Sequence, residues 1–339
     1  MTRLHAASFI TFLFSFFLLS SALYSQQTHG KKSPRNIIFD SDMGPDYDDV
    51  GAITLLHAFA DQGKVKILAT IASTRYDNVA AVLSVFNTYF GRPAIPIAVP
   101  RAHGLDLRDW QHWSDTLVAK YPHAVKRNDE VGEPVDLYRK LLAKAPDTSV
   151  TIITVGFLTN LADLLRSAPD QYSSLDGAAL IKKKVKLLVS MAARFPAGNE
   201  FNVNRDAAAS IYTYTNWPTP VWFSGFEIGK KIKTGLPLIH NNAIQHSPVK
   251  DVFRIAIPMA AEDSAGRKSW DETAVLVGST GFAPYYELRE GRININPDGS
   301  NTWDENGKGH FHLVEKRPSQ EVQALINELI QHQPAHTSF

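Results

Sequence analysis

The chain has 339 residues, 44% of them hydrophobic, with 35 Lys and Arg against 34 Asp and Glu. Such a chain can bury a large core, and its balanced charge excludes the strongly basic surface that attracts a nucleic-acid backbone or an anionic membrane. The sequence contains no cysteine, which excludes disulfides, thiolate metal sites and cysteine nucleophiles. We therefore expect a small-molecule partner.

Residues 1–25 are typical of a secretory signal peptide. Arg3 and His5 precede an apolar run over residues 6–19, and a stretch of small residues ends before Gln26. An uncleaved membrane anchor is the alternative, because an apolar run of roughly 14 to 18 residues is near the lower limit for crossing a bilayer. We predict cleavage and export, periplasmic or secreted, with no membrane association afterwards.

After a polar linker over residues 26–34, short aliphatic runs alternate with longer amphipathic ones, as strands and crossover helices do in a parallel sheet. No internal repeat or second linker interrupts this pattern, so we predict a single α/β domain over residues 35–333, followed by a tail over residues 334–339. Its fold is an open, mostly parallel central sheet flanked by helices. The predicted strands cover residues 36–39, 65–71, 95–99, 149–154, 185–191 and 221–223, with a further strand at residues 310–312. The predicted helices cover residues 50–60, 78–90, 134–145, 160–167, 207–215 and 321–332, and residues 101–129 are predicted as a loop.

Five aspartates lie within ten residues at the end of the first predicted strand, at positions 40, 42, 46, 48 and 49. Open α/β sheets bind ligands at the carboxyl ends of their strands. Carboxylates crowded in one loop repel one another unless protons or a cation neutralise them, and their oxygens suit calcium or magnesium. The cluster therefore predicts a metal site. The alternative is that Asp48 and Asp49 only stabilise the first turn of the next helix, which would explain two of the five.

This aspartate segment resembles the N-terminal signature D-x-D-P-G-x-D-D of the inosine-uridine preferring nucleoside hydrolase family, in the variant D-x-D-x-G-x-D-x-D-D. Three further segments resemble family motifs in the same order: residues 154–160 its P-T-G-x-L-T-N turn, residues 199–206 its E-F-N-x-x-x-D segment, and residues 269–271 its late aspartate motif. The resemblance covers nearly all of the chain after residue 34. It implies calcium-dependent hydrolysis of the N-glycosidic bond of a nucleoside, and a homodimer or homotetramer.

The same resemblance implies a role for individual residues. Asp42, Asp49 and Asp271, together with the backbone carbonyl of Val155, would bind Ca²⁺. The reaction requires water to attack the anomeric carbon of ribose, and Asp42 is the predicted general base because a carboxylate beside the attacking water can accept its proton directly. The remaining predicted residues are the substrate-binding side chains Asp48, Asn78, Asn199, Glu200 and Asn202, and Asp40, which would orient the aspartate loop.

Three of these segments also have structural interpretations. Glu200 and Asn202 are predicted to alternate along an extended segment, which would place both on one face, although Gly198 and Asn199 alone would suit a turn. We expect Asp206 to cap the helix that begins at residue 207. Asn160 is a candidate cap as well.

The most informative departure from the family pattern is Trp270. Many family members carry His before the late aspartate, and that His is thought to protonate the departing base. Tryptophan cannot do so, and Trp270 instead resembles the purine-preferring branch, in which an aromatic side chain stacks on the base, an interaction worth about 1 to 3 kcal/mol. We therefore predict purine nucleosides as substrates. Trp110 or Trp113 is the candidate for a second aromatic wall, unless these are ordinary core or surface aromatics.

Two other functions compete with this prediction. A haloacid-dehalogenase-like phosphatase also has D-x-D after its first strand, but a Thr or Val follows there, whereas Gly44 and the pair Asp48 and Asp49 follow here. An exported receptor that binds a nucleoside or sugar without cutting it would explain the missing His. The presence of Asp42 argues against that receptor.

Overall fold

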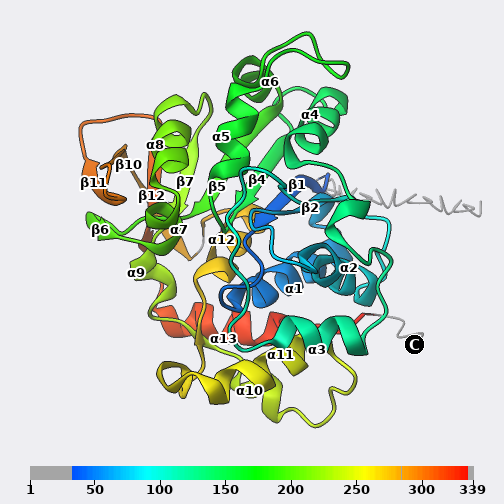
Figure 1. Ribbon diagram of the computed structural model, residues 1–339. Helices are drawn as coiled ribbons and strands as arrows, with labels where there is room; N and C mark the ends of the chain where they lie inside the picture. Colours follow the sequence, from blue (N-terminus) through cyan, green and yellow to red (C-terminus); the bar gives the residue numbers. More distant parts are fainter. Residues whose placement is uncertain (1–32, 284, 335–339) are drawn as a thin grey trace, which may run out of the picture. The chain divides into compact units, whose positions relative to one another are not determined.

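The central feature of the fold is a broad sheet (Figure 1). The computed structural model describes residues 33–283 and 285–334. Ten strands of this part of the chain form one sheet in the order β3-β2-β1-β4-β5-β7-β12-β10-β11-β6, while β8 and β9 pair separately. The strands are β1 (Arg35–Ser41), β2 (Val65–Ala72), β3 (Ile97–Ala98), β4 (Val150–Thr154), β5 (Val185–Met191), β6 (Ala197–Asn199), β7 (Val221–Ser224), β8 (Lys233–Thr234), β9 (Arg267–Lys268), β10 (Tyr286–Ile295), β11 (Ser300–Asp304) and β12 (His310–Glu315).

Most of this sheet is parallel. Every neighbouring pair from β3 to β12 in the sheet order is parallel, and β10, β11 and β6 extend the sheet in antiparallel pairs. The predicted open, mostly parallel sheet is therefore confirmed. The predicted signal peptide, most of the linker and residues 335–339 lie outside the described residues. Within the two described ranges, no helix is both long and apolar enough to cross a bilayer.

Helices cover both faces of the sheet (Figure 1). Side chains alternate along a strand, so Ile37 and Phe39 of β1 enter one hydrophobic cluster and Ile38 enters the other. The first cluster also contains residues of α1, α2, α11, α12 and α13, and the second contains residues of α4, α5, α6 and α8. The helices are α1 (Asp48–Asp61), α2 (Val79–Tyr89), α3 (Trp113–Lys120), α4 (Pro134–Lys144), α5 (Thr159–Arg166), α6 (Gly177–Lys184), α7 (Phe201–Arg205), α8 (Ala207–Asn216), α9 (Phe226–Gly229), α10 (Leu236–His240), α11 (Pro248–Ala256), α12 (Trp270–Thr280) and α13 (Ser319–Leu329).

The helices α1 and α12 are buried on nearly all sides and pack against each other. Their close approach requires a glycine, because a Cβ atom on Gly51 would lie 2.1 Å from Oε1 of Glu272. The first turns of the two helices are joined, since the backbone N–H groups of Trp270 and Asp271 both donate to Asp48. Two helices distant in the sequence thus bring their acidic first turns to one place.

Three sequence predictions differ from the structure. The predicted loop over residues 101–129 contains α3, a short helix whose buried residues are only Trp113, Ser114 and Leu117, too few for a clear helical pattern. The predicted extended segment at Glu200 is instead the start of α7. Asn160 is not a helix cap: it lies inside α5 and donates to Asp40. The predicted cap at Asp206 is confirmed by its bond from the N–H of Ala209.

Candidate active site

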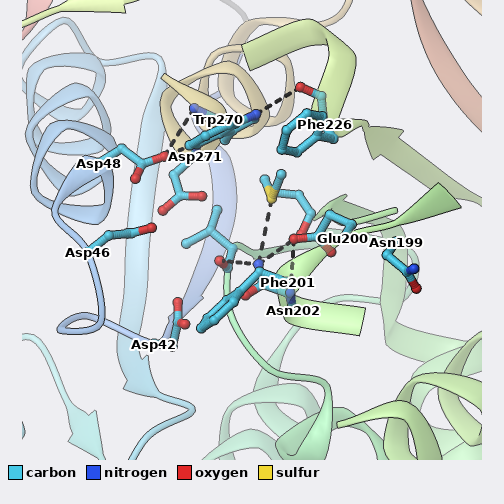
Figure 2. A pocket seen from close by; sticks show the side chains of 12 residues that line it. Asp42, Asp46, Asp48, Asn199, Glu200, Phe201, Asn202, Phe226, Trp270 and Asp271 are labelled. Atoms are coloured by element: carbon cyan, nitrogen blue, oxygen red, sulfur yellow. Dashed lines mark hydrogen bonds between the residues drawn. The ribbon is translucent and has the colours of Figure 1, made fainter. Parts of the chain in front are cut away.

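A pocket brings together residues from both halves of the chain (Figure 2). It lies where the segments following β1, β4 and β5 meet the first turn of α12, at the strand ends where ligands of parallel sheets bind. One side is acidic, the opposite side carries amide and carboxyl groups, and aromatic rings border both. The lining residues are Asp42, Asp46, Asp48, Val155, Met191, Asn199, Glu200, Phe201, Asn202, Phe226, Trp270 and Asp271.

The loop after β1 is held by hydrogen bonds from Ser41. Its hydroxyl donates to Oδ1 of Asp49 at 2.5 Å and accepts from the N–H of Met43 at 3.0 Å. The turn after β4 packs against this loop so closely that a Cβ atom on Gly156 would lie 2.4 Å from the backbone nitrogen of Asp42. Any larger residue in place of Gly156 would therefore displace the backbone at Asp42.

Burial and repulsion between carboxylates raise the pKa values of Asp42, Asp49 and Asp271. Loss of solvation is the largest cause at Asp42, where the charges of Asp49 and Asp46 add to it. Burial also comes first at Asp271, followed by repulsion from Asp48 and Asp49. The pKa of Asp49 is raised to about 7 by burial and by the charge of Asp48. These carboxylates need protons or a cation to coexist.

The acidic side fits a hard divalent cation by its chemistry. Oδ2 of Asp49 is buried without a hydrogen-bond partner, and the carboxyl groups of Asp42 and Asp271 border the same pocket. Oxygen atoms of this kind are the usual ligands of calcium. Among the described residues, however, no three His, Asp or Glu side chains already converge as a finished metal site. Asp42, Val155 and Asp271 thus line one pocket, whereas the fourth expected ligand, Asp49, lies outside the lining, with its Oδ1 bonded to Ser41.

Asp48 and Asp46 differ from the other carboxylates because both bind Arg267. Nε and Nη2 of Arg267 donate to Oδ1 of Asp48 at 3.0 and 2.6 Å, and Nη2 also forms an ion pair with Asp46. Oδ2 of Asp48 accepts the N–H groups of Trp270 and Asp271 at 3.1 and 3.3 Å. Asp48 therefore joins α1 to α12 while it lines the pocket.

The opposite side of the pocket is held by backbone hydrogen bonds. Glu200 caps the N-terminus of α7, and its carboxylate accepts hydrogen bonds from the N–H groups of Asn202 at 2.9 Å, Ala193 at 3.1 Å and Val203 at 3.2 Å. Burial outweighs these donors and raises the pKa of Glu200 to about 7. The amide of Asn202 donates to the carbonyl of Val155 at 2.9 Å. The two residues expected to bind ribose thus share one rigid turn.

Trp270 and Phe226 form a continuous aromatic wall. Their ring centroids are 5.2 Å apart with an interplanar angle of 31°, and Nε1 of Trp270 donates to the carbonyl of Phe226 at 2.8 Å. This bond fixes the indole plane, and Phe201 adds a third ring at the pocket. Asn199 lies at the pocket's edge, away from the other labelled side chains (Figure 2).

Asn78 and both candidate tryptophans lie outside the pocket lining, and so does Asp40, which was expected only to orient the aspartate loop. Asp40 does not line the pocket: its Oδ2 accepts from Tyr138 at 2.8 Å and Asn160 at 3.0 Å, and burial raises its pKa to about 7. Asn78 starts α2 in a left-handed conformation, with φ 74°, outside the lining. Neither candidate for the second aromatic wall lines the pocket: Trp113 is fully buried in the core and Trp110 is 54% exposed.

Sequence reasoning missed Arg267, Phe201 and Phe226. Arg267 lies only four residues before Asp271, and Phe201 lies between Glu200 and Asn202, so proximity to the motifs was an available signal for both. Phe226 begins a four-residue helix far from any recognised motif, and its sequence carries no such signal.

Comparisons with known proteins agree with this architecture. The profile of the family "Inosine-uridine preferring nucleoside hydrolase" matches residues 37–333. No curated protein matches the chain by sequence. A plant nucleoside hydrolase is 18% identical, with a TM-score of 0.67 over 88% of this chain and 99% of the other. An inosine-uridine preferring nucleoside hydrolase from Bacillus anthracis is 14% identical, with the same TM-score and coverage.

A purine-preferring ribonucleoside hydrolase from Gardnerella vaginalis shares the fold as well. It is 15% identical, and its TM-score is 0.65 over 88% of this chain and 99% of the other. These structures show the fold, and the profile match over most of the chain shows the family. The chain therefore belongs to the inosine-uridine preferring nucleoside hydrolase family and is a hydrolase of N-glycosidic bonds.

Proposed function

We propose that this hydrolase is calcium-dependent and cleaves purine ribonucleosides in preference to pyrimidine ribonucleosides, releasing ribose and the free base. The observation that carries the proposal is the composition of the pocket. Asp42 and Asp271 border it on one side, Glu200 and Asn202 on the other, and Trp270 supplies an aromatic wall. A sugar diol, a divalent cation and a planar base each have a matching surface there.

The residues proposed to bind calcium are Asp42, Asp49, Asp271 and the carbonyl of Val155. The unpartnered, buried Oδ2 of Asp49 supports this choice, as does the burial that raises the pKa values of Asp42 and Asp271. When bound, a calcium ion supplies Lewis-acid polarisation of the attacking water and of the ribose hydroxyls. The carbonyl of Val155 already accepts one hydrogen bond from Asn202, and its second lone pair remains for a cation.

Asp42 is the proposed general base. In the reaction a water oxygen bonds to the anomeric carbon while the bond from that carbon to the base nitrogen breaks, through a transition state with oxocarbenium character. The carboxylate of Asp42 accepts the proton that the attacking water loses. Burial and repulsion raise the pKa of Asp42 in the metal-free protein, and a bound cation would lower it again and so keep the carboxylate ionised. The departing base takes its own proton from solvent.

The other side of the pocket is proposed to bind the sugar, and the aromatic wall the base. Glu200 and Asn202 keep their positions through α7, which favours them as partners of the ribose hydroxyls, together with Asp48 and Asn199. Trp270 stacks on the base and favours its departure, and the larger ring surface of a purine gains more from this contact. The structural neighbour from Gardnerella vaginalis is itself described as purine-preferring.

The experiment that tests this function is a substrate panel. The protein is incubated with inosine, adenosine and uridine, with and without a chelator, while free base and ribose are measured. We expect faster release from inosine and adenosine than from uridine, and loss of activity on chelation that added calcium restores. Binding without release of base would favour a receptor instead, a function that agrees with the absence of His from the described residues that line the pocket. Phosphate release from a phosphomonoester would favour a phosphatase.

We also propose that the enzyme is exported. The support is the sequence of residues 1–25, with basic residues before an apolar run and small residues after it. Expression of the full chain in a bacterial host, followed by fractionation and N-terminal sequencing, tests this proposal. We expect the mature protein outside the cytoplasm, beginning near Gln26. An intact N-terminus in the membrane fraction would indicate an anchor.

A further inference from the structure

The five aspartates that lie on or beside the acidic side of the pocket fall into two groups. Asp46 and Asp48 form ion pairs with Arg267. Within the described ranges, Asp42, Asp49 and Asp271 form no ion pair with any Lys, Arg or His. These three aspartates, which form no direct ion pair, are the same three that the proposed function assigns to calcium, although the charge of Arg267 also acts on Asp49.

Arg267 occupies a fixed position between these groups. Its side chain contacts three acidic residues: Asp48 through Nε and Nη2, Asp46 through Nη2, and Asp263 through Nη1 at 3.6 Å. Asp263 is held in turn by the hydroxyl of Tyr47 at 2.7 Å. Since Arg267 is 8% exposed and the side chain of Asp48 is 2% exposed, this pair is poorly screened by solvent and is stronger than a surface ion pair, whereas the side chain of Asp46 is 43% exposed.

The guanidinium plane is also confined by aromatic rings. Its central carbon lies 5.0 Å from the ring centroid of Tyr47 and 5.2 Å from that of Trp270. A planar, delocalised cation fits such a position and bridges two carboxylates at once, whereas the compact ammonium group of lysine does neither well. Arg267 thus connects the aspartate loop to the indole proposed to contact the base.

We infer that Arg267 is a positioning residue that holds Asp46 and Asp48 away from the metal and leaves Asp42, Asp49 and Asp271 to bind it. This inference rests on the proposed function for the identity of the metal site. It assigns Asp48 to the substrate rather than to the ion. It also gives Arg267 a second effect, since a fixed cation beside the cluster lowers its affinity for a divalent ion.

These two effects give a prediction of opposite sign for binding and turnover. Removing the charge in Arg267→Met frees two carboxylates and removes a repelling cation, so we expect calcium to bind about 3- to 30-fold more tightly. Turnover should fall at least about tenfold, because Asp48 and Trp270 lose the contact that orients them. A residue needed only for folding would weaken calcium binding and turnover together.

Calorimetric titration of the full chain with calcium, alongside kcat and KM on inosine, tests the inference. The variants are Arg267→Met and Arg267→Lys, and the matched control is Arg139→Met. Arg139 is equally buried and binds Asp170 and Ser167, neither of which lines the pocket. The control should lose thermal stability with calcium affinity unchanged. Arg267→Lys keeps the charge, so its calcium affinity should stay within about twofold of wild type while kcat falls.

Two results would overturn the inference: calcium binding that weakens or stays equal in Arg267→Met, or wild-type kcat in Arg267→Lys. Should Arg267→Met not fold, Arg267→Lys alone tests the inference, because it is expected to keep its calcium affinity while its kcat falls. If the wild-type protein binds calcium but hydrolyses no nucleoside, the proposed function fails. The calcium titrations then still test whether Arg267 keeps Asp46 and Asp48 from binding the metal. The two failures are therefore distinguishable.

Discussion

The two sides of the pocket solve the problem of buried polar groups in different ways. On the Glu200 side, the carboxylate accepts hydrogen bonds from three backbone N–H groups, and the amide of Asn202 donates to the carbonyl of Val155. On the acidic side, Oδ2 of Asp49 has no partner, and burial with repulsion raises the pKa values of Asp42 and Asp271. The first side is complete within the protein, whereas the second requires something from outside it.

This difference indicates that the Glu200 side binds the substrate and that the acidic side carries out the chemistry. A surface satisfied by its own backbone is preorganised, so it can position a sugar at little cost in entropy. A surface of unpaired carboxylates is unstable by itself and gains most when a cation and a reacting water arrive. Substitutions on the two sides should therefore change activity and stability in different proportions.

The largest effect is expected for Asp42→Asn on the acidic side. The substitution removes the proposed base, so turnover of inosine should fall by about 10²- to 10⁴-fold, the range typical of general-base catalysis. Removing one of several repelling carboxylates should leave the melting temperature of the metal-free protein equal or higher. Steady-state kinetics and thermal unfolding measure the two effects. Wild-type rates in this variant would remove Asp42 from the proposed mechanism.

A smaller effect is expected for Trp270→Ala on the aromatic wall. Loss of stacking worth about 1 to 3 kcal/mol corresponds to about a 5- to 150-fold decrease in kcat/KM for inosine. The decrease for uridine should be smaller, because a pyrimidine offers less ring surface. Phe226→Leu is a useful comparison, because it removes the neighbouring ring but keeps the backbone carbonyl that accepts the hydrogen bond from the Trp270 indole. An equal loss for both substrates would count against base stacking.

The metal itself should act on the acidic side alone. Calcium at about 100 times its dissociation constant should raise the free energy of unfolding by about 2.7 kcal/mol. Asp271→Asn should lose most of this stabilisation, because Asp271 is one of the proposed ligands. Asn202→Ala should keep more of it, although the protein is less stable from the start after losing the bond to the Val155 carbonyl. Urea unfolding with calcium or a chelator measures these differences, and stabilisation retained in Asp271→Asn would exclude it as a ligand.

The sequence was sufficient to predict where the aspartates after β1 lie, but not which cation they meet. Asp42 and Asp49 follow a strand recognisable by its aliphatic run, and local order alone places such residues at the sheet edge. The partners of Asp48 were not predictable in this way. Arg267 and Asp48 are 219 positions apart in the sequence. The spacing of hydrophobic residues predicts helices and strands, but it does not predict which distant cation pairs with which carboxylate.

The Glu200 side shows a second limit. Glu200 and Asn202 were recognised as a pair, but their alternation suggested an extended segment, whereas α7 begins at Phe201. This helix has five residues, too short for a helical pattern to show in the sequence. Glu200 stabilises its first turn through bonds to the N–H groups of Asn202 and Val203. An N-cap role for Glu, which is less common than for Asp or Ser, concealed the helix.

A further effect is expected in the pH dependence of stability on the Glu200 side. The pKa of Glu200 is about 7 in the folded protein against 4.5 for the ordinary group. The folded state therefore keeps a proton that the unfolded state releases between these values, so this group makes the protein less stable as pH rises from 4.5 to 7. Glu200→Gln lacks this titration. Relative to wild type, the variant should gain on the order of 3 kcal/mol between about pH 4 and pH 8.

Urea unfolding of both proteins at several pH values, with chelator present, measures that gain. The carboxylates of the acidic side titrate in both proteins, so their contribution cancels in the comparison. A stability difference that stays constant with pH would mean that the three backbone donors keep Glu200 ionised when folded. The Glu200 side would then be complete as a charged surface, and its contrast with the acidic side would be sharper still, because only the acidic side would need a cation to stay ionised.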